Sequence, residues 1–416
     1  MLLNRMISRF KVRRSSKYVG LFLISLSCLT ILECIHSSRM NSLLIVDLNV
    51  NDSRISIYRN RSELITNQCD SSVSYSGESQ MLLVKYPWLN GAIYRIQSQS
   101  LIYCTIPKIA SKTTISLLIY VYIRDLLQRL QNKSINVNEE ISKHIPISLL
   151  INQMKKNGIT ISNEVNQSNS TTSILQTYLN LLQYESLDKN SSSIFFNPWR
   201  LDIGKLFDEI QFRKVLNLSE LYDSSYSRVI FVRHPFERLA SAYKERIGTL
   251  PKDRIQSEPY YDNVRRLICA RYSKVTSYQQ RLSVRQSCEN SIPSFEHFVE
   301  YILSLSQTNT NVDRMDAHWK PFSRICQVCL FKYNFILKYE TFNDDLRMFL
   351  NRLNVSHWNI DKRRGASGHS NQQYKQFYSN LPNQLICRLI KLYYDDFHLF
   401  NYRIDDYVNT TALSCS

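Results

Sequence analysis

Residues 228–243 read RVIFVRHPFERLASAY, and this stretch decides the fold. A run of β-branched and aromatic residues followed by Pro235 predicts a strand, a tight turn and a helix. Arg233 stands at the carboxyl end of the predicted strand, and Ser241 lies two turns into the predicted helix. Ligands that carry phosphate bind at this edge of an open α/β sheet. We therefore predict an α/β fold with a central parallel sheet and flanking helices.

This turn offers three kinds of group to an anion. Arg233 presents a planar fork of donors, Ser241 presents a hydroxyl, and the start of the helix carries the positive end of a dipole. Together these groups suit a dianionic phosphate. An arginine at the end of a strand also forms structural ion pairs, and this segment alone leaves that alternative open.

A second stretch repeats the pattern earlier in the chain. Residues 101–114 read LIYCTIPKIASKTT, which predicts another strand and a turn rich in small and hydroxylated residues, followed by an apolar helix over residues 115–130. Backbone N–H groups at such a turn cradle a phosphate, and Lys108 adds a point charge. The loop has no glycine and its lysine precedes the turn, which disfavours an ATP-dependent kinase.

The two turns together resemble the nucleotide-binding motifs of the Golgi sulfotransferases that use 3′-phosphoadenosine 5′-phosphosulfate (PAPS). Three downstream segments are similar to the branch that contains the HNK-1, chondroitin 4-O and dermatan 4-O sulfotransferases: DAHWKP at 316–321, CQVC at 326–329 and YNFILKYET at 333–341. The resemblance covers roughly residues 95–405. It implies a PAPS-binding sulfotransferase fold resembling the nucleotide kinases, with PAPS as co-substrate and no metal.

The resemblance also implies roles for the residues of both turns. Lys108 would stabilise the charge that develops on the bridging oxygen, while Arg233 and Ser241 would hold the 3′-phosphate. The residues implied to bind the nucleotide are Pro107, Lys108, Ile109, Ala110, Ser111, Lys112 and Thr113 in the first turn, and Arg233, His234, Pro235, Phe236, Glu237, Arg238, Leu239, Ala240 and Ser241 in the second. Residues 111–113 stand where the chondroitin 4-O branch typically has Cys-Thr-Asn, which leaves the detail of 5′-phosphate binding open.

The reaction needs a general base to take the proton of the acceptor hydroxyl. We favour His318, because Asp316 would orient its imidazole and Trp319 would shield it or stack on a sugar face. A purely structural role for His318 stays open. The alternative bases are Glu237, Glu340 and His144.

The N-terminal residues predict a membrane anchor. Basic residues in the tail, residues 1–17, precede an apolar run over residues 18–35, which predicts a cytosolic tail, a type II signal-anchor and a lumenal remainder in the Golgi. A cleaved signal peptide is the alternative. We expect residues 36–91 to be a lumenal stem and residues 92–416 to be the sulfotransferase domain. About residues 132–193 we expect a low-complexity surface insertion or, alternatively, a lid over the acceptor.

Charge and cysteine usage agree with that compartment. The formal charge of +17 falls to +11 without the six basic residues of the tail, and a basic lumenal domain suits an anionic donor and a polyanionic glycan. An anchored chain would not meet nucleic acid. Nine Asn-x-Ser/Thr sequons follow the anchor, and eight cysteines lie beyond it. For Cys326 and Cys329 we expect disulfides to the region of Cys269 and Cys288 in preference to a zinc site.

We therefore predict an enzyme that transfers a sulfuryl group from PAPS to a hydroxyl of a glycan. The acceptor would be N-acetylgalactosamine at its 4-O position in chondroitin or dermatan, or a related terminal sugar. The alternatives are a non-catalytic glycan-binding relative and a uronyl or heparan 2-O-type sulfotransferase. The arginine-rich residues 265–285 would either line the acceptor groove or form a solvated helix face.

Overall fold

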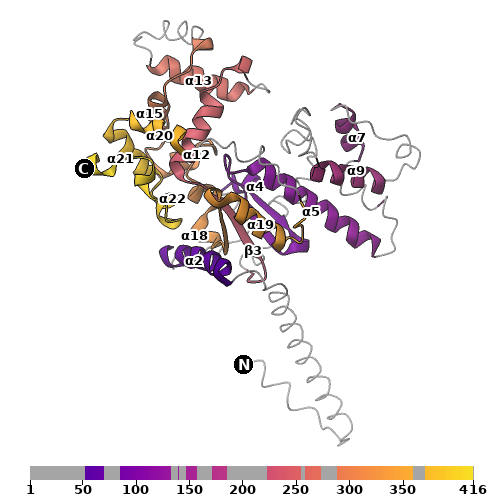
Figure 1. Ribbon diagram of the computed structural model, residues 1–416. Helices are drawn as coiled ribbons and strands as arrows, with labels where there is room; N and C mark the ends of the chain where they lie inside the picture. Colours follow the sequence, from indigo (N-terminus) through magenta and orange to yellow (C-terminus); the bar gives the residue numbers. More distant parts are fainter. Residues whose placement is uncertain are drawn as a thin grey trace, which may run out of the picture. The chain divides into compact units, whose positions relative to one another are not determined.

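The structure of the 416-residue chain is a computed structural model (Figure 1). It describes residues 52–69, 85–132, 139, 147–156, 171–184, 223–253, 258–272, 288–358 and 371–415. The chain divides into two units, residues 1–57 and residues 58–416, and the second unit holds the fold discussed below. None of the described helices is both long and apolar enough to cross a membrane. The anchor predicted over residues 18–35 lies outside the described residues.

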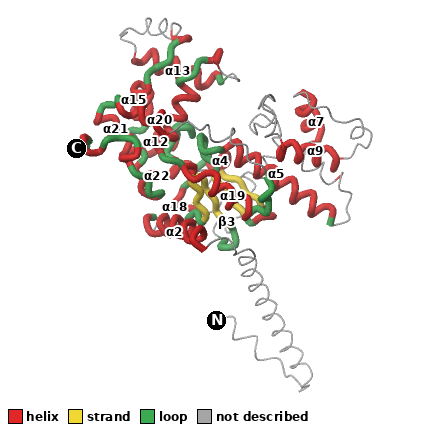
Figure 2. The backbone as a smooth tube through the Cα atoms, in the orientation of Figure 1, coloured by secondary structure: helices red, strands yellow, loops and turns green. Residues whose placement is uncertain are grey.

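Within the described residues, four strands form one sheet in the order β1-β2-β3-β4. Their bounds are β1 (Ile93–Ile96), β2 (Leu101–Cys104), β3 (Ser227–Val232) and β4 (Phe335–Lys338). Strands β2, β3 and β4 are parallel, as predicted, but β1 pairs antiparallel with β2. Only residues 97–100 join β1 to β2, which is too short for a crossover, so the pair must be antiparallel. The sheet, whose strands are yellow in Figure 2, is therefore mixed.

The three parallel strands end at the same edge of the sheet. The register pairs Cys104 of β2 with Ile230 of β3, and Val232 of β3 with Lys338 of β4. All four residues of β2 and the last four of β3 are buried, which explains their unbroken apolar sequence. The turns that follow these strands therefore lie together at the carboxyl edge, where the sequence places its site residues.

Helices surround this sheet and form a second, mainly helical part of the unit. The longer helices are α2 (Asp52–Gln68), α5 (Ser111–Gln131), α7 (Ile147–Lys156), α9 (Thr171–Tyr184), α12 (Pro235–Ala242), α13 (Pro259–Tyr272), α15 (Phe295–Leu305), α19 (Phe342–Arg352), α20 (Asn371–Ser379) and α21 (Asn383–Leu392). The shorter ones are α4 (Leu89–Ala92), α16 (Asn309–Asp313), α17 (Phe322–Cys326), α18 (Val328–Phe331), α22 (Tyr394–Leu399) and the π-helical turn η6 (Tyr243–Ile247). Single 3₁₀ turns are η3 (Gln97–Gln99), η7 (Pro251–Asp253), η8 (Cys288–Asn290), η9 (Tyr339–Thr341), η11 (Ile404–Asp406) and η12 (Thr410–Ala412).

Two hydrophobic cores hold these parts. One surrounds the sheet, and in it Phe349 of α19 lies against Tyr103 and Phe231, with ring centroids 6.1 and 6.4 Å away. The other joins α12, α13, α15, α20 and α21. In this second core Leu385, Leu389, Tyr393 and Phe397 recur at helical spacing and are buried.

Part of the expected stem belongs to the folded unit. In α2 the Tyr58 hydroxyl donates a hydrogen bond to Asp345 Oδ1 at 2.8 Å, and Arg61 donates to Asp345 Oδ2 at 2.7 Å. The Tyr58 ring stacks on Phe335 with centroids 5.1 Å apart. These contacts and the disulfide from Cys69 fix α2 to β4 and α19 from Tyr58 onwards.

The expected insertion is also partly packed. Helix α9 lies against α5, and α7 lies against α9 (Figure 1). Leu150, Leu175, Tyr178 and Leu179 are buried and belong to the core around the sheet. The two helices are therefore not a solvated loop, because they cover an apolar face of α5.

The cysteine pairing differs from the one expected. Cys326 is bonded to Cys104, and Cys329 is bonded to Cys69, so the Cys-x-x-Cys pair holds β2 and α2. Cys269 and Cys288 bond to each other instead, because η8 brings Cys288 back to α13. Cys387 and Cys415 form the fourth bridge. The prediction of disulfides to the region of Cys269 and Cys288 is therefore wrong, although disulfide bonding itself is confirmed.

Candidate active site

The turn after β2 exposes the start of a long helix. Lys108 and Ala110 both adopt the left-handed conformation, with φ of 73° and 49°. Ala110 is the N-cap of α5, and no side chain caps this end of the helix. The helix therefore begins at Ser111 and not at Ile115 as predicted. Its first-turn N–H groups and its positive dipole end are left to bind an anion.

Two buried arginines pin this turn to neighbouring segments. Arg233 Nη1 donates a hydrogen bond to the Lys108 carbonyl at 2.9 Å, and Arg238 Nε donates to the Pro107 carbonyl at 3.1 Å. Arg238 also donates to the carbonyls of Lys320, at 2.8 Å, and Ala317. Arg238 is 1% exposed, so its contacts make it a clamp between the Lys108 turn and the 316–321 segment.

Lys108 sits among other cations. Burial lowers its pKa well below the usual value, and Arg246, Arg233 and Lys112 lower it further. The Lys108 ammonium contacts the Glu245 carboxylate, whose side chain is 48% exposed. Thus Glu245, and Glu258 through its pair with Arg246, are the carboxylates that face this cluster of positive charge. An anion bound at this turn would relieve the repulsion among these cations.

Arg233 is held in place on several sides. Its Nη2 donates to Glu237 Oε1 at 2.6 Å, and its guanidinium carbon lies 4.3 Å from the centroid of the Tyr339 ring. Burial opposes its charge, but Glu237 and Tyr339 hold the pKa of Arg233 above its usual value. Its Nε atom is buried and has no hydrogen bond in the part of the chain that the structure describes. Ser241 lies two turns further along, is 9% exposed, and its hydroxyl has no hydrogen bond among the described residues.

His234 has a structural set of contacts. It is the N-cap of α12, where its Nδ1 accepts from the Phe236 N–H at 3.3 Å and its Nε2 donates to the Arg403 carbonyl at 2.9 Å. Burial lowers the pKa of His234 to about 4, so the ring is neutral at physiological pH. Its backbone N–H donates to Glu340 Oε1 at 2.7 Å, and Tyr402 donates to Glu340 Oε2 at 3.0 Å.

Two of the three alternative bases are engaged in hydrogen bonds, and the third lies outside the described residues. Glu340 accepts two hydrogen bonds as above, and Glu237 accepts from Arg233 and, at 2.9 Å, from the Tyr407 hydroxyl. Both carboxylates thus hold the architecture of the second turn. His144 lies outside the described residues.

The remaining residues of the two predicted turns divide by exposure. Thr113 is buried, and its hydroxyl has no hydrogen bond among the described residues, whereas Lys112 is exposed and Ser111 half-buried. The others are buried apolar residues that pack in the two cores or shape the turns: Ile109, Pro235, Phe236, Leu239 and Ala240.

His318 is held at one ring nitrogen and open at the other. Its Nδ1 lies 2.8 Å from Asp316 Oδ1 and 2.7 Å from the Tyr261 hydroxyl, which in turn donates to Asp316 Oδ2 at 3.3 Å. The Asp316 carboxylate favours a proton on Nδ1, which leaves the lone pair on Nε2. Nε2 makes no hydrogen bond within the described ranges. Burial lowers the pKa of His318; Asp316 opposes this shift, and the charges of Arg246 and Lys108 add to it.

Three residues of the site were missed by the sequence reasoning. Glu245 and Arg246 lie on the π-helical turn directly after the quoted stretch; Arg246 pairs with Glu258 and stands 4.8 Å from the Tyr261 ring centroid. A π-helical turn is frequent at functional sites, but nothing in the sequence marks this one. Tyr261 carried no signal either, because its contact with His318 joins residues 57 positions apart.

For Trp319 and Arg265 the structure excludes an acceptor contact, which was one of the alternatives for each residue. Trp319 is 1% exposed and packs edge-on against Phe298, with centroids 5.5 Å apart, so it has no face for a sugar. Arg265 is fully buried and donates to the carbonyls of Cys288, Glu289 and Ser291. Both side chains are enclosed by the fold, and Arg265 also pairs with the Asp262 carboxylate.

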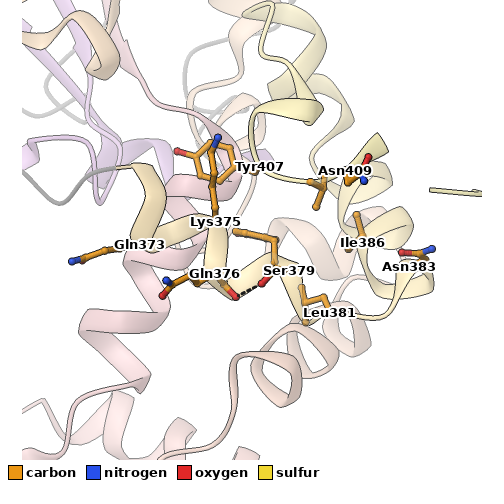
Figure 3. A pocket seen from close by; sticks show the side chains of 11 residues that line it. Gln373, Lys375, Gln376, Ser379, Leu381, Asn383, Ile386, Tyr407 and Asn409 are labelled. Carbon is orange, nitrogen blue, oxygen red and sulfur yellow. Dashed lines mark hydrogen bonds between the residues drawn. The ribbon is translucent and has the colours of Figure 1, made fainter. Parts of the chain in front are cut away.

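A separate cavity of about 870 Å³ lies beside α20, α21 and the C-terminal residues (Figure 3). It is lined by Gln373, Lys375, Gln376, Tyr378, Ser379, Leu381, Asn383, Ile386, Tyr407, Val408 and Asn409. None of the predicted site residues lines this cavity. It borders the predicted site through Tyr407, which donates to Glu237, and through Tyr378, which donates to the Phe236 carbonyl at 2.6 Å. In the described part of the chain, no group of three or more His, Cys, Asp or Glu side chains is arranged to hold a metal ion.

Comparison with known proteins gives a family and a set of relatives. The chain is 28% identical to carbohydrate sulfotransferase 12 of Xenopus laevis over 222 residues, which is 53% of this chain and 49% of that protein. It is 31% identical to carbohydrate sulfotransferase 8 of Mus musculus over 43% of this chain and 40% of that protein. It is 28% identical to carbohydrate sulfotransferase 10 of Gallus gallus over 54% of this chain and 59% of that protein. The chain thus spans about half the length of these curated relatives, and no solved structure matches it.

Residues 93–403 match the family described as the sulfotransferase family. This range begins at β1 and contains all three parallel strands, both turns and the 316–321 segment. It covers more than half of the chain. We conclude that the chain belongs to the sulfotransferase family.

Proposed function

We propose that this protein transfers a sulfuryl group from PAPS to a hydroxyl group of a glycan. The observation that carries the proposal is Lys108 at the uncapped start of α5, in a turn that the buried Arg238 joins to the segment of His318, whose Nε2 makes no hydrogen bond among the described residues. A cation at an anion site and a general base are the two groups that sulfuryl transfer to a hydroxyl requires. The names of the relatives, all carbohydrate sulfotransferases, support a glycan as acceptor.

The residues at the first turn fit a phosphosulfate group. The free N–H groups of α5 and the exposed Lys112 offer donors and positive charge, and the Thr113 hydroxyl is a buried group without a partner among the described residues. In the structure the Lys108 ammonium forms an ion pair with the Glu245 carboxylate. The Glu245 side chain is 48% exposed, so it can move away when an anion binds. Cations, dipole and unsatisfied donor all favour an anionic donor at this turn.

Arg233 and Ser241 are proposed to hold the 3′-phosphate. Arg233 is the more constrained of the two, because it already binds Glu237 and the Lys108 carbonyl. Its unsatisfied Nε and the free Ser241 hydroxyl are the donors that remain. Through the Lys108 carbonyl, binding at Arg233 would also fix the turn that carries Lys108.

The proposed reaction is an in-line displacement. The acceptor oxygen bonds to sulfur while the bond from sulfur to the bridging 5′-phosphate oxygen breaks, and His318 Nε2 takes the hydroxyl proton. Lys108 stabilises the negative charge that grows on the departing oxygen. Asp316 stabilises the imidazolium that forms, and the products are a sulfated glycan and 3′-phosphoadenosine 5′-phosphate.

The acceptor and the compartment complete the proposal. We propose N-acetylgalactosamine 4-O in chondroitin or dermatan, or a related terminal sugar, as acceptor, and a single-pass type II protein of the Golgi membrane. The four disulfides support an oxidising compartment. A non-catalytic glycan-binding protein is disfavoured because it needs neither Lys108 nor an oriented His318.

A transfer assay tests this function. The full chain is incubated with ³⁵S-labelled PAPS and with desulfated chondroitin, dermatan, heparosan and an N-glycan, and labelled products are digested to locate the sulfate. We expect label on a galactosaminoglycan at the 4-O position. Label only on uronic acid would favour the 2-O-type alternative. Binding of 3′-phosphoadenosine 5′-phosphate without any transfer would favour the non-catalytic relative.

A further inference from the structure

Helix α13 begins two residues before Tyr261, which contacts the candidate base, and one face of this helix carries a row of exposed side chains. Tyr260 is 56% exposed and Leu267 is 42% exposed, which makes them two of the most exposed large apolar side chains in the described residues. Asn263 and Arg271 are also exposed. These four positions are spaced three or four residues apart, so they form one stripe along the helix, about 16 Å long.

The stripe joins apolar and cationic groups. Arg266 lies beside it and donates to the Asn263 side-chain oxygen at 2.7 Å, while Arg271 donates to Ser304 on α15 at 3.0 Å. The carboxylates of this helix do not oppose them, because Asp262 is buried and pairs with Arg265. At the far end, Arg388 and Glu300 both lie near Tyr272, so one acidic and one further basic group flank the stripe there.

The stripe is continuous with the candidate active site at its N-terminal end. The Tyr260 ring meets the Tyr261 ring edge-on, with centroids 5.0 Å apart, and Tyr261 contacts His318. Burial and the nearby Asp316 raise the pKa of Tyr260, which agrees with its place next to the Asp316–His318 pair. A sugar stacked on Tyr260 would thus lie beside the base.

We propose that the exposed stripe of α13, formed by Tyr260, Asn263, Leu267 and Arg271, together with the half-buried Arg266 beside it, is the platform that binds an extended anionic polysaccharide acceptor. This inference rests on the proposed function and, of the two kinds of acceptor proposed there, selects the polyanionic chain over a terminal sugar. An exposed aromatic ring stacks on a sugar face, the amide of Asn263 binds hydroxyls, and the two arginines bind carboxylates or sulfates. A length of about 16 Å suits several sugar units rather than one terminal residue.

Two sets of variants test the platform. Tyr260→Ala removes the stacking ring, and Arg266→Ala combined with Arg271→Ala removes the charges. The matched controls are Tyr394→Ala, an equally exposed tyrosine on α22 at 57%, and Arg347→Ala combined with Arg403→Ala, two exposed arginines elsewhere. Each protein is measured for KM with chondroitin polymer and with its disaccharide, for affinity to immobilised chondroitin sulfate, and for affinity to 3′-phosphoadenosine 5′-phosphate.

We expect KM for the polymer to rise about tenfold in the Tyr260 variant and in the double arginine variant, with a weaker dependence on salt in the latter. Affinity for immobilised chondroitin sulfate should fall in parallel, nucleotide affinity should stay the same, and KM for the disaccharide should respond only to Tyr260. Unchanged affinity for chondroitin sulfate in both variants overturns the platform, whether or not transfer occurs. If the wild type transfers no sulfate but the variants lose affinity for chondroitin sulfate as expected, the proposed chemistry is rejected and the polysaccharide-binding platform on α13 is supported.

Discussion

At the scale of the residue, the orientation of His318 decides which atom does the chemistry. Asp316 and Tyr261 both contact Nδ1, while Nε2 makes no hydrogen bond in the described part of the chain. The same segment carries Lys320 and Ala317, whose carbonyls are bound by Arg238. The buried guanidinium of Arg238 therefore joins the segment of His318 to the turn that carries Lys108. This link fixes the position of His318 relative to Lys108.

The first prediction concerns the base itself. Replacement of His318 by Ala should reduce turnover roughly a hundredfold to ten-thousandfold, the range for loss of a positioned base, with little change in nucleotide affinity. Burial depresses the pKa of His318, so the neutral base persists as pH falls. Wild-type turnover should therefore decline only below about pH 6.5, the usual histidine value. A variant that turns over within a few-fold of wild type would assign His318 a structural role.

Tyr261 should act as a positioning residue. The change Tyr261→Phe removes the hydroxyl that donates to Asp316, which leaves the carboxylate a stronger partner for the His318 ring. The pH at which turnover is half-maximal should rise, and the maximal rate should drop several-fold while KM for PAPS stays unchanged. A pH profile that superimposes on that of wild type would exclude this role, since a merely structural tyrosine does not move it.

Sequence motifs predicted the residues of the two turns but not how they are used. Lys108 and Arg233 follow apolar strands, and that local pattern placed them at the carboxyl edge. Arg238 and Glu237 were also placed in the nucleotide motif, yet both form hydrogen bonds with residues between 79 and 170 positions away. Such distant partners leave no trace in local periodicity. For the same reason neither alternative for Arg265, an acceptor contact or a solvated face, included its bonds to three backbone carbonyls.

At the scale of the element, the π-helical turn η6 sets the rim of the site. It follows α12 directly and carries Glu245 to Lys108 and Arg246 to the Tyr261 ring. An α-helix continued past Ala242 would rotate these side chains to other directions, because the π turn holds an extra residue. The rim of the site thus depends on a local irregularity that propensity does not predict.

Helices α7 and α9 are expected to stabilise the sheet core without serving the chemistry. Leu175 is fully buried between α9 and α5, so Leu175→Ala should reduce the free energy of unfolding by about 2–5 kcal/mol. The neighbouring Gln176 is exposed, so Gln176→Ala should change the free energy of unfolding by less than about 0.5 kcal/mol. Urea unfolding measures both. Equal midpoints for the two variants would show that this region is a solvated insertion after all, as composition alone indicated.

At the scale of the whole unit, two disulfides form one nested clasp. Cys104–Cys326 and Cys69–Cys329 join the same two stretches of chain, and their partners are 222 and 260 residues apart in the sequence. When one of these bonds is intact, the other closes a loop of only about 38 residues, which runs through residues 69–104 and 326–329. The sheet strand β2 and the helix α2 are both tied to the Cys-x-x-Cys segment. That connectivity could not be read from the sequence, because spacing does not determine pairing.

The nested arrangement predicts a non-additive loss of stability. Removal of either bond alone, as a double Cys→Ala variant, should cost about 4 kcal/mol, and removal of both should cost more than the sum, because the second removal opens a loop of more than 200 residues. Denaturant unfolding of the three variants gives the comparison. Simple additivity would mean that the loops act independently and that chain entropy does not explain the clasp.

The central claim is that Lys108 stabilises the transition state of sulfuryl transfer at the start of α5. The most direct test measures kcat with PAPS and the dissociation constant of 3′-phosphoadenosine 5′-phosphate for wild type and Lys108→Ala, with the exposed Lys252→Ala as control. We predict a loss of roughly a hundredfold to a thousandfold in kcat for Lys108→Ala with nucleotide affinity within a few-fold of wild type, and no change for the control. Turnover within a few-fold of wild type, or a loss of affinity as large as the loss of turnover, would contradict the claim.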